Sequence, residues 1–82
     1  MIRVRYFAWL KARIGRAEDS VSPTPPTVAA LIATLAARGP GYANALANPE
    51  AIRAAINHEF AEADAPLRDG DEVALFPPVT GG

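Results

Sequence analysis

The stretch FPPVTGG, residues 76–82, contains the groups best suited to chemistry in this chain. Pro77 and Pro78 fix φ near −65° and favour an extended backbone. Six residues from Pro77 span roughly 20 Å at about 3.1–3.5 Å each, so the chain end can stand clear of a folded domain. Gly81 and Gly82 lack a Cβ and can enter a narrow channel at whatever φ it requires. The predicted reactive group is the α-carboxylate of Gly82, which needs activation before it can act as an acyl donor.

Other groups for catalysis are scarce in the sequence. There is no cysteine, which excludes disulfides, thiolate metal sites and a cysteine nucleophile. The single histidine, His58, has no second His or Cys to share a zinc ion, and a solvated side chain is the favoured interpretation. No glycine-rich phosphate loop follows a predicted strand. We therefore expect no metal site and no bound cofactor, and the chain does not look like a self-contained enzyme.

Length and composition indicate one small globular domain. The chain has 82 residues, 50% of them hydrophobic and 21% charged, with a net charge of −1. A domain of this size buries only about 60% of its unfolded surface, so its expected stability is modest. Without a basic excess, a finger pattern or an RNP-like pattern, no nucleic-acid partner is expected. The longest apolar run, residues 28–37, is too short to cross a bilayer, and MIRVRYFAWL lacks a signal-peptide layout, which favours a cytoplasmic protein without a membrane partner.

Alternation of apolar and polar residues predicts the strands that carry this chain end. Residues 2–8 predict a half-buried strand, residues 18–22 a weak second one, residues 51–57 a third and residues 59–62 a short edge strand. The last strand, 72–76, follows a turn at Asp69-Gly70. The residues predicted to point inward are Ile2, Val4, Tyr6, Ala8, Ile52, Ala54, Ile56, Val73 and Leu75. Those predicted to point outward are Arg3, Arg5, Phe7, Arg53, Asn57, Glu72, Ala74 and Phe76.

Helical spacing predicts a short helix over residues 9–15, closed by Gly15, and one longer helix. Thr27 is the expected N-cap of the longer helix, and Gly39-Pro40 is expected to stop it. Arg38 near its end suits the helix dipole. One face is apolar, with Val28, Leu31, Ile32 and Leu35 at positions i, i+3, i+4 and i+7. Residues 39–50 carry no firm assignment, although Tyr42 and Leu46 lie one helical turn apart.

This order of elements predicts an α+β two-layer domain, in which one main helix covers one face of a sheet. The other face stays open, and Phe7 and Phe76 stand together on its charged side as a candidate partner patch. Arg3, Arg5 and Arg53 are candidates for pairing with acidic partner groups at the rim, and solvated arginines are an equally good interpretation. The alternative for a phenylalanine is a place in the core, where large apolar residues usually lie.

The whole chain also resembles a known family. Its order of elements is similar to the β-grasp (ubiquitin-like) fold. The segment DGDEVALFPPVTGG, residues 69–82, resembles the C-terminus of molybdopterin synthase small subunits, which are sulfur carriers; IRVRYFAWLKARIG, residues 2–15, and PTV, residues 26–28, resemble that family's first strand and helices. The resemblance implies a β-grasp domain with a mixed sheet over residues 1–76 and an extended tail over residues 77–82. Thiamine-pathway sulfur carriers also end in Gly-Gly but look shorter and lack the Pro-Pro stem.

The chemistry implied by this resemblance depends on other proteins. An E1-like adenylyltransferase would activate Gly82 with ATP and magnesium, and a sulfurtransferase would supply sulfur to give a terminal thiocarboxylate. The large subunit of molybdopterin synthase, in a heterotetramer of two small and two large subunits, would then take the tail into its active site and pass the sulfur to a pyranopterin precursor. The small subunit would be a non-catalytic sulfur donor, because the reaction centre lies on the large subunit. The residues implied to meet the partner are Phe60, which extends the patch, and Pro77, Pro78, Val79, Thr80 and Gly81.

Three function classes stay open on the residues alone. They are a sulfur carrier for molybdopterin, a ubiquitin-like modifier joined through Gly82 to lysines of other proteins, and a passive β-grasp interaction module. A terminal thiocarboxylate marks the first class and isopeptide conjugates mark the second, whereas the third makes neither product.

Overall fold

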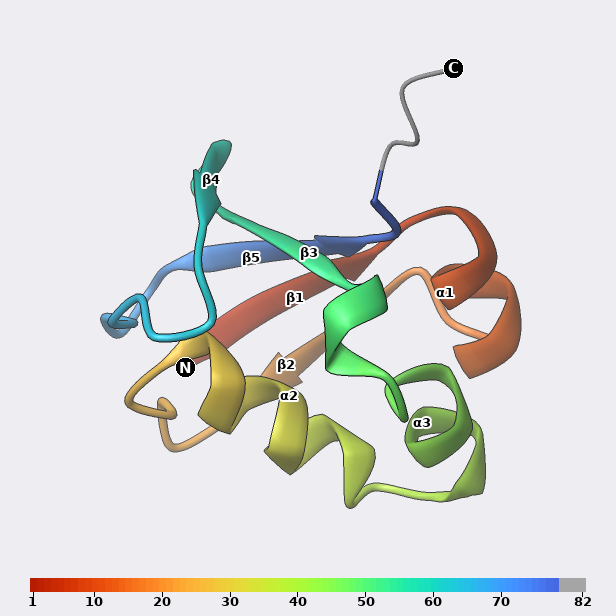
Figure 1. The fold of residues 1–82 in the computed structure, drawn as a ribbon. Helices are drawn as coiled ribbons and strands as arrows, with labels where there is room; N and C mark the ends of the chain where they lie inside the picture. The colour runs from red at the N-terminus through yellow and green to blue at the C-terminus, as the bar shows by residue number, and fades with distance from the viewer. Residues whose placement is uncertain (79–82) are drawn as a thin grey trace.

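The computed structural model describes residues 1–78, which form five strands, three α-helices and one 3-10 turn (Figure 1). The order is β1 (Ile2–Tyr6), α1 (Ala8–Ile14), β2 (Glu18–Val21), α2 (Val28–Ala36), α3 (Pro40–Ala45), the 3-10 turn η1 (Pro49–Ala51), β3 (Arg53–Ile56), β4 (Glu59–Ala61) and β5 (Glu72–Phe76). The predicted strands and both predicted helices are all present, and α3 and η1 occupy the segment that had no assignment.

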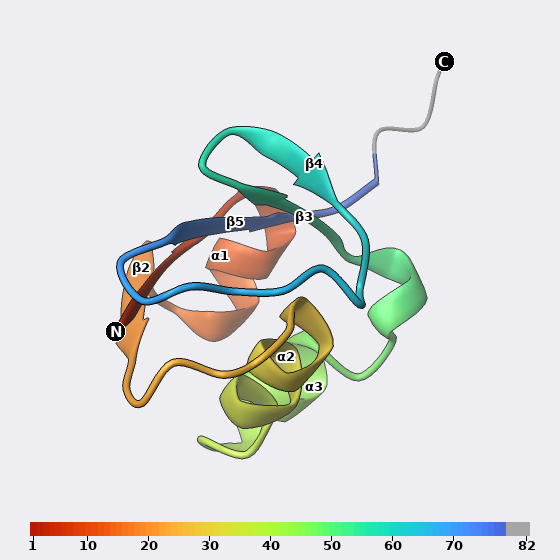
Figure 2. The ribbon, with the colours of Figure 1, turned by 90° about the vertical axis from the view of Figure 1, so that its left-hand side faces the viewer.

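The strands form one mixed sheet in the order β2-β1-β5-β3-β4. β1 and β5 run parallel in its centre, with Val4 opposite Val73 and Tyr6 opposite Leu75, and the other neighbouring strands run antiparallel. Figures 1 and 2 show α2 and α3 on one side of the sheet, whereas the other side is not covered by a helix. The predicted α+β architecture, with a mixed sheet and one main helix on one face, is confirmed. The first strand and the last lie side by side, so the chain end leaves from the middle of the sheet.

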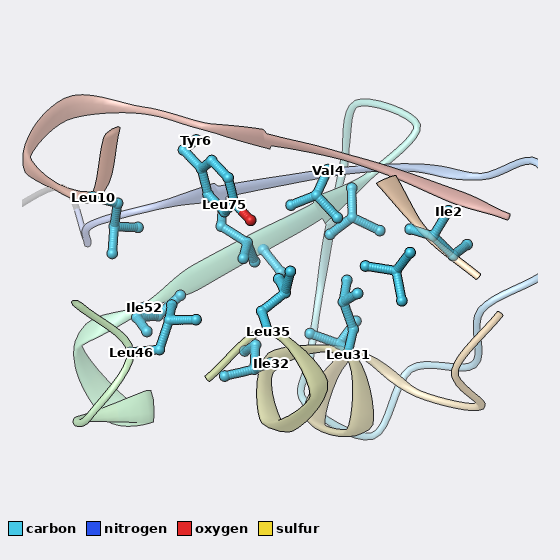
Figure 3. Packing of buried hydrophobic residues seen from close by; sticks show 14 of the residues in the cluster. Ile2, Val4, Tyr6, Leu10, Leu31, Ile32, Leu35, Leu46, Ile52 and Leu75 are labelled. Carbon is cyan, nitrogen blue, oxygen red and sulfur yellow. The ribbon is translucent and has the colours of Figure 1, made fainter. Parts of the chain in front are cut away.

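The core lies between this sheet and α2 (Figure 3). Val28, Leu31, Ile32 and Leu35 are all buried, which confirms the predicted apolar face of the longer helix. The inward alternation of the strands is also confirmed where it sets the core: the buried residues are Ile2, Val4, Tyr6, Ala54, Val73 and Leu75. At about 1.5–3 kcal/mol for each large apolar side chain fully removed from water, this layer is the main source of stability.

Two predicted helix ends are confirmed in detail. The Thr27 hydroxyl accepts a hydrogen bond from the Ala30 N–H at 3.2 Å, so one of the free amides at the start of α2 has a partner. Gly15 has φ 84° and donates its N–H to the Lys11 carbonyl at 2.8 Å. A side chain would be strained in this left-handed conformation, which explains why glycine ends α1.

The ends of several elements differ from the sequence prediction, and Ala51, predicted to start the third strand, lies in η1. β1 ends at Tyr6, and Ala8, predicted to point inward, is exposed and starts α1 with φ 56°, because the chain has to turn out of the strand there. β3 ends at Ile56, and Asn57 lies in the turn to β4 with φ 49°. α2 ends at Ala36, before the predicted stop.

The dipole interpretation of Arg38 is also wrong. Arg38 lies beyond the end of α2, and its guanidinium donates to the Ser20 carbonyl at 2.8 Å instead of meeting the last carbonyls of the helix. Within residues 1–78 no helix has the length and apolar character needed to span a bilayer.

Candidate functional site

The tail leaves the domain at the end of the central strand β5. The Phe7 N–H donates to the Leu75 carbonyl at 3.1 Å, which ties the end of β5 to the end of β1. On the other side of β5, Phe76 lies opposite Arg53 of β3. Both views show residues 77–78 leaving the sheet on the side away from α2 (Figures 1 and 2). The base of the stem is thus held by two neighbouring strands, while Pro77 and Pro78 are only half-buried.

The proposed reactive residues Gly81 and Gly82 lie outside the described residues, as do Val79 and Thr80. Their roles therefore stay predictions.

Phe60 and Phe76 form an aromatic pair beside the base of the stem. Their ring centroids are 5.8 Å apart and the rings are inclined at 56°. The strand between them brings them together, because Ala55 of β3 lies opposite Phe60 and Arg53 lies opposite Phe76. Phe60 is 84% exposed, the largest exposure among the large hydrophobic residues described. Phe60 together with Phe76 is therefore the candidate apolar contact for a partner on this sheet face.

Phe7 is exposed, as predicted, but it does not join this pair. The aromatic ring pairs in the described residues are Tyr6–Tyr42 and Phe60–Phe76. The Phe7 ring instead lies under the Arg5 guanidinium, 5.7 Å from its centroid. The predicted patch of Phe7 and Phe76, extended by Phe60, stays a prediction: the structure pairs the rings of Phe60 and Phe76, and Phe7 follows Tyr6, which lies opposite Leu75.

The three arginines predicted for the rim are all exposed. Arg3 lies opposite Glu72 in the register of β1 and β5, and Arg5 reaches the Glu72 carboxylate at 3.8 Å. An exposed ion pair of this kind contributes about 0–1 kcal/mol, so it leaves Arg5 free to exchange partners. Arg53 lies directly opposite Phe76. The structure thus gathers Arg53, Phe60 and Phe76 on one surface, while Arg3 and Arg5 lie farther along the same sheet.

Sequence reasoning missed a buried carboxylate, Asp19, on β2. Only 9% of Asp19 is exposed, and it accepts hydrogen bonds from the Tyr6 hydroxyl at 3.0 Å and the Tyr42 hydroxyl at 2.6 Å. Guanidinium groups of Arg16 and Arg38 lie 3.2 Å and 3.6 Å from it. The pattern Glu-Asp-Ser-Val of β2 held the signal, because alternation turns its second residue inward together with Val21.

The Asp19 cluster changes the acidity of the two phenols. Burial raises the pKa of Tyr6, and the hydrogen bond to Asp19 raises it further. The pKa of Tyr42 is raised first by its hydrogen bond to Asp19 and then by burial. Both phenols therefore stay protonated and donate to the carboxylate. The cluster joins β1, β2, α3 and the segment after α2, so its role is to hold these elements together.

His58 is exposed in the turn between β3 and β4, as predicted. Over residues 1–78 no group of three or more His, Cys, Asp or Glu side chains could hold a metal ion.

A five-stranded mixed sheet with a main helix across one face and its last strand in the centre is the ubiquitin-like β-grasp fold. The structure is similar to that of SAMP1 from Haloferax volcanii, with a TM-score of 0.75 and 28% identity over 99% of this chain and 98% of that one. It is also similar to a chain of the complex of subunits 1 and 2 of molybdopterin-converting factor from Helicobacter pylori 26695, with a TM-score of 0.66 and 26% identity over 99% and 97%.

The family follows from the sequence match. The ThiS family model matches residues 4–82, and the chain belongs to this family. A curated relative from Escherichia coli (strain K12), the molybdopterin synthase sulfur carrier subunit, is 44% identical over 82 residues, which is 100% of each chain.

Proposed function

We propose that this protein is the sulfur-carrier small subunit of a molybdopterin synthase. The full-length match to the Escherichia coli sulfur carrier subunit is the observation that carries the proposal. The structure supports it physically, because the stem of Pro77 and Pro78 follows the central strand β5 and leaves the sheet on the side away from α2. The chain itself supplies the sulfur-bearing group, and the reaction centre belongs to the large subunit.

The proposed chemistry takes place at the Gly82 carboxylate. An E1-like adenylyltransferase transfers AMP from ATP, with magnesium, to this carboxylate and releases pyrophosphate. Sulfur that a sulfurtransferase supplies at the oxidation level of sulfide then displaces AMP and leaves a thiocarboxylate. The sulfur passes from there to a pyranopterin precursor on the large subunit. ATP-dependent activation of this kind suits the cytoplasm, which is the location we propose.

The partner of the open sheet face is the large subunit in this proposal. The Helicobacter pylori neighbour is described as a complex of subunits 1 and 2, which supports a partner of this kind. Phe60 and Phe76 would be the apolar contact, with Arg53 beside them and Phe7, Arg3 and Arg5 farther along β1. Pro77, Pro78, Val79, Thr80 and Gly81 would follow the tail into the active site. Two small and two large subunits would make up the assembly.

A second function has one observation in its favour. Solved structures of a small archaeal modifier protein 1 share this fold, with a TM-score of 0.75 and 27% identity for one from Haloferax volcanii. A modifier would use the same Gly82 carboxylate but transfer it to lysine amines of other proteins. The thiamine-pathway alternative has less support, since two curated relatives that match over the full chain are molybdopterin synthase sulfur carrier subunits.

Intact-mass spectrometry of the protein isolated from its own host tests the proposal directly. We expect a population in which one oxygen has been replaced by sulfur, and fragmentation should place the change at Gly82. Isopeptide conjugates in place of that species would favour the modifier function. Unmodified chain alone, in cells that are making molybdopterin, would refute the proposal.

Variants of the chain end give an independent test. Deleting Gly82, or adding one residue after it, should abolish molybdopterin synthesis in a complementation assay and leave the thermal melt unchanged. The physical reason is that the reacting group is the terminal carboxylate, whereas the core lies between β1, β5 and α2. Normal cofactor synthesis by the deletion variant would contradict the proposed role of Gly82.

A further inference from the structure

The charges of this protein are strongly separated along the chain. Residues 1–17 hold five of the eight Lys and Arg residues and none of the nine Asp and Glu residues. The remainder therefore holds three basic and nine acidic residues. The net charge of −1 is therefore the sum of a basic segment, residues 1–17 with β1 and α1, and an acidic remainder. The basic residues of this segment are Arg3, Arg5, Lys11, Arg13 and Arg16.

α1 combines these cations with an exposed tryptophan. Leu10 is fully buried and anchors the helix, while Trp9 is 37% exposed. The Arg13 guanidinium, one turn further along, lies 4.9 Å from the centroid of the Trp9 ring. Stacking on the ring holds the guanidinium in place and leaves its N–H groups free to bind a planar anion such as a carboxylate. In the described part of the chain, neither Arg13 nor Lys11 forms an ion pair.

A hollow of about 380 Å³ lies on another flank of the same helix. Its walls include Lys11 and Arg16, and the small side chains of Ala8, Ala12 and Ala17 line the rest together with Gly15. Cations at the rim of a shallow alanine-lined hollow suit an acidic side chain that also has an apolar stem. We name the surface formed by Trp9 and Arg13 the α1 face; Lys11 and Arg16 line the hollow on the other flank, where Arg16 is already paired with Asp19 at 3.2 Å.

The α1 face lies at the end of the sheet from which the tail leaves. α1 follows Phe7 directly, and the Phe7 N–H is bonded to the carbonyl of Leu75, two residues before the stem. Figure 1 shows α1 and the start of the tail at the same end of the molecule. A protein that encloses the tail therefore approaches α1 as well.

We infer that the α1 face binds acidic residues of the large synthase subunit, as a second contact beside the Phe60–Phe76 pair. This inference rests on the proposed function. A polyanion such as RNA or an anionic membrane would also meet the acidic remainder of the chain, whereas a protein can present carboxylates to the α1 face alone. Because the contact is ionic, it speeds the encounter and orients the tail at the entrance of the partner's active site.

The test compares matched charge reversals in binding to the purified large subunit by calorimetry at low and at high salt. Arg13→Glu should weaken binding by about tenfold at low salt and flatten the salt dependence, since it removes one attraction and adds one repulsion. Arg68→Glu makes the same charge change in the acidic loop before β5 and should stay within about twofold. Lys11→Glu is the second variant and reverses a charge at the hollow on the other flank of α1. A circular dichroism melt shows that each variant is folded.

The outcomes separate the inference from the function on which it rests. Equal affinity of Arg13→Glu and Arg68→Glu, with parallel salt dependence, overturns the inference and leaves the proposed function standing. A loss of binding confined to the activating enzyme, or binding of the wild type to RNA or anionic vesicles through these same residues, also overturns it. Failure of the wild type to bind the large subunit at all overturns the proposed function, and the inference falls with it.

Discussion

Truncation of Phe60 gives the sharpest separation between binding and folding in this structure. Phe60 stands on the short edge strand β4 with 84% of its surface exposed, and its ring packs against Phe76. Phe60→Ala should weaken binding to the large subunit strongly and reduce stability only slightly. The stability of the domain should change little, because most of the Phe60 ring is exposed to solvent in the free protein.

The magnitudes follow from that exposure. Full burial of a phenylalanine side chain is favourable by about 1.5–3 kcal/mol. If the partner covers the exposed part, truncation should cost about 2 kcal/mol of binding free energy, or roughly thirtyfold in Kd. Within the free domain, the loss is limited to the contact with the Phe76 ring, which is about 0.5–1.5 kcal/mol for an aromatic pair.

Isothermal titration with the large subunit and urea unfolding, both on the same purified variant, measure the two losses. Glu59→Ala, next to it on β4 and also exposed, is a matched control for changes to the edge strand itself. A Phe60→Ala protein that binds with wild-type affinity would refute the assignment of the partner surface. A stability loss larger than the binding loss would show that the ring belongs to the fold and not to an interface.

Three further predictions concern stability, and urea or thermal unfolding measures each of them. Leu31→Ala removes a fully buried side chain from α2 and should cost about 2–5 kcal/mol, so an unchanged midpoint would contradict the core described here. Asp19→Ala should lower the free energy of unfolding by about 3 kcal/mol, because it leaves the buried Tyr6 hydroxyl without its acceptor. Tyr42→Phe removes one hydrogen bond of a half-buried ring and should lower it by about 1 kcal/mol. The pKa of Tyr6 is raised above its ordinary value of 10.0. The folded state therefore favours the neutral phenol of Tyr6. The stability that this phenol contributes is fully present below about pH 10 and is lost as the pH rises toward the pKa of the folded state. Stability of the wild type should fall above about pH 10 more steeply than that of Tyr6→Phe, and parallel profiles would argue against the buried bond.

Sequence patterns predicted the features that depend on neighbours within one element. The alternation in 72–76 and the i, i+3, i+4, i+7 spacing from Val28 to Leu35 each identify one buried face, and the structure agrees with both. Thr27 and Gly15 were identifiable as caps because they act on amides or carbonyls a few residues away.

Features that depend on distant segments were missed or misplaced. Asp19 accepts hydrogen bonds from Tyr6, 13 residues before it, and from Tyr42, 23 residues after it. Its ion pair with Arg38 also joins distant segments. The ring contact of Phe76 with Phe60 depends on β3 lying between β5 and β4, so alternation within one strand could not identify it, and Phe60 was named only from the family resemblance. Residues 40–45 form α3 and residues 49–51 form η1, although proline and alanine gave no clear periodicity there.

The hydrogen bond from Arg38 to the Ser20 carbonyl affects how readily the protein can exchange one binding partner for another. β2 is one border of the sheet, and an unoccupied carbonyl there would invite another strand to pair with it. Arg38 occupies that carbonyl, and the opposite border, β4, offers only three residues. Backbone pairing with another chain is therefore discouraged at both borders, so encounters depend on side chains that separate readily. A sulfur carrier that receives sulfur from one enzyme and delivers it to another has to dissociate readily from both, and contacts made by side chains alone suit that requirement.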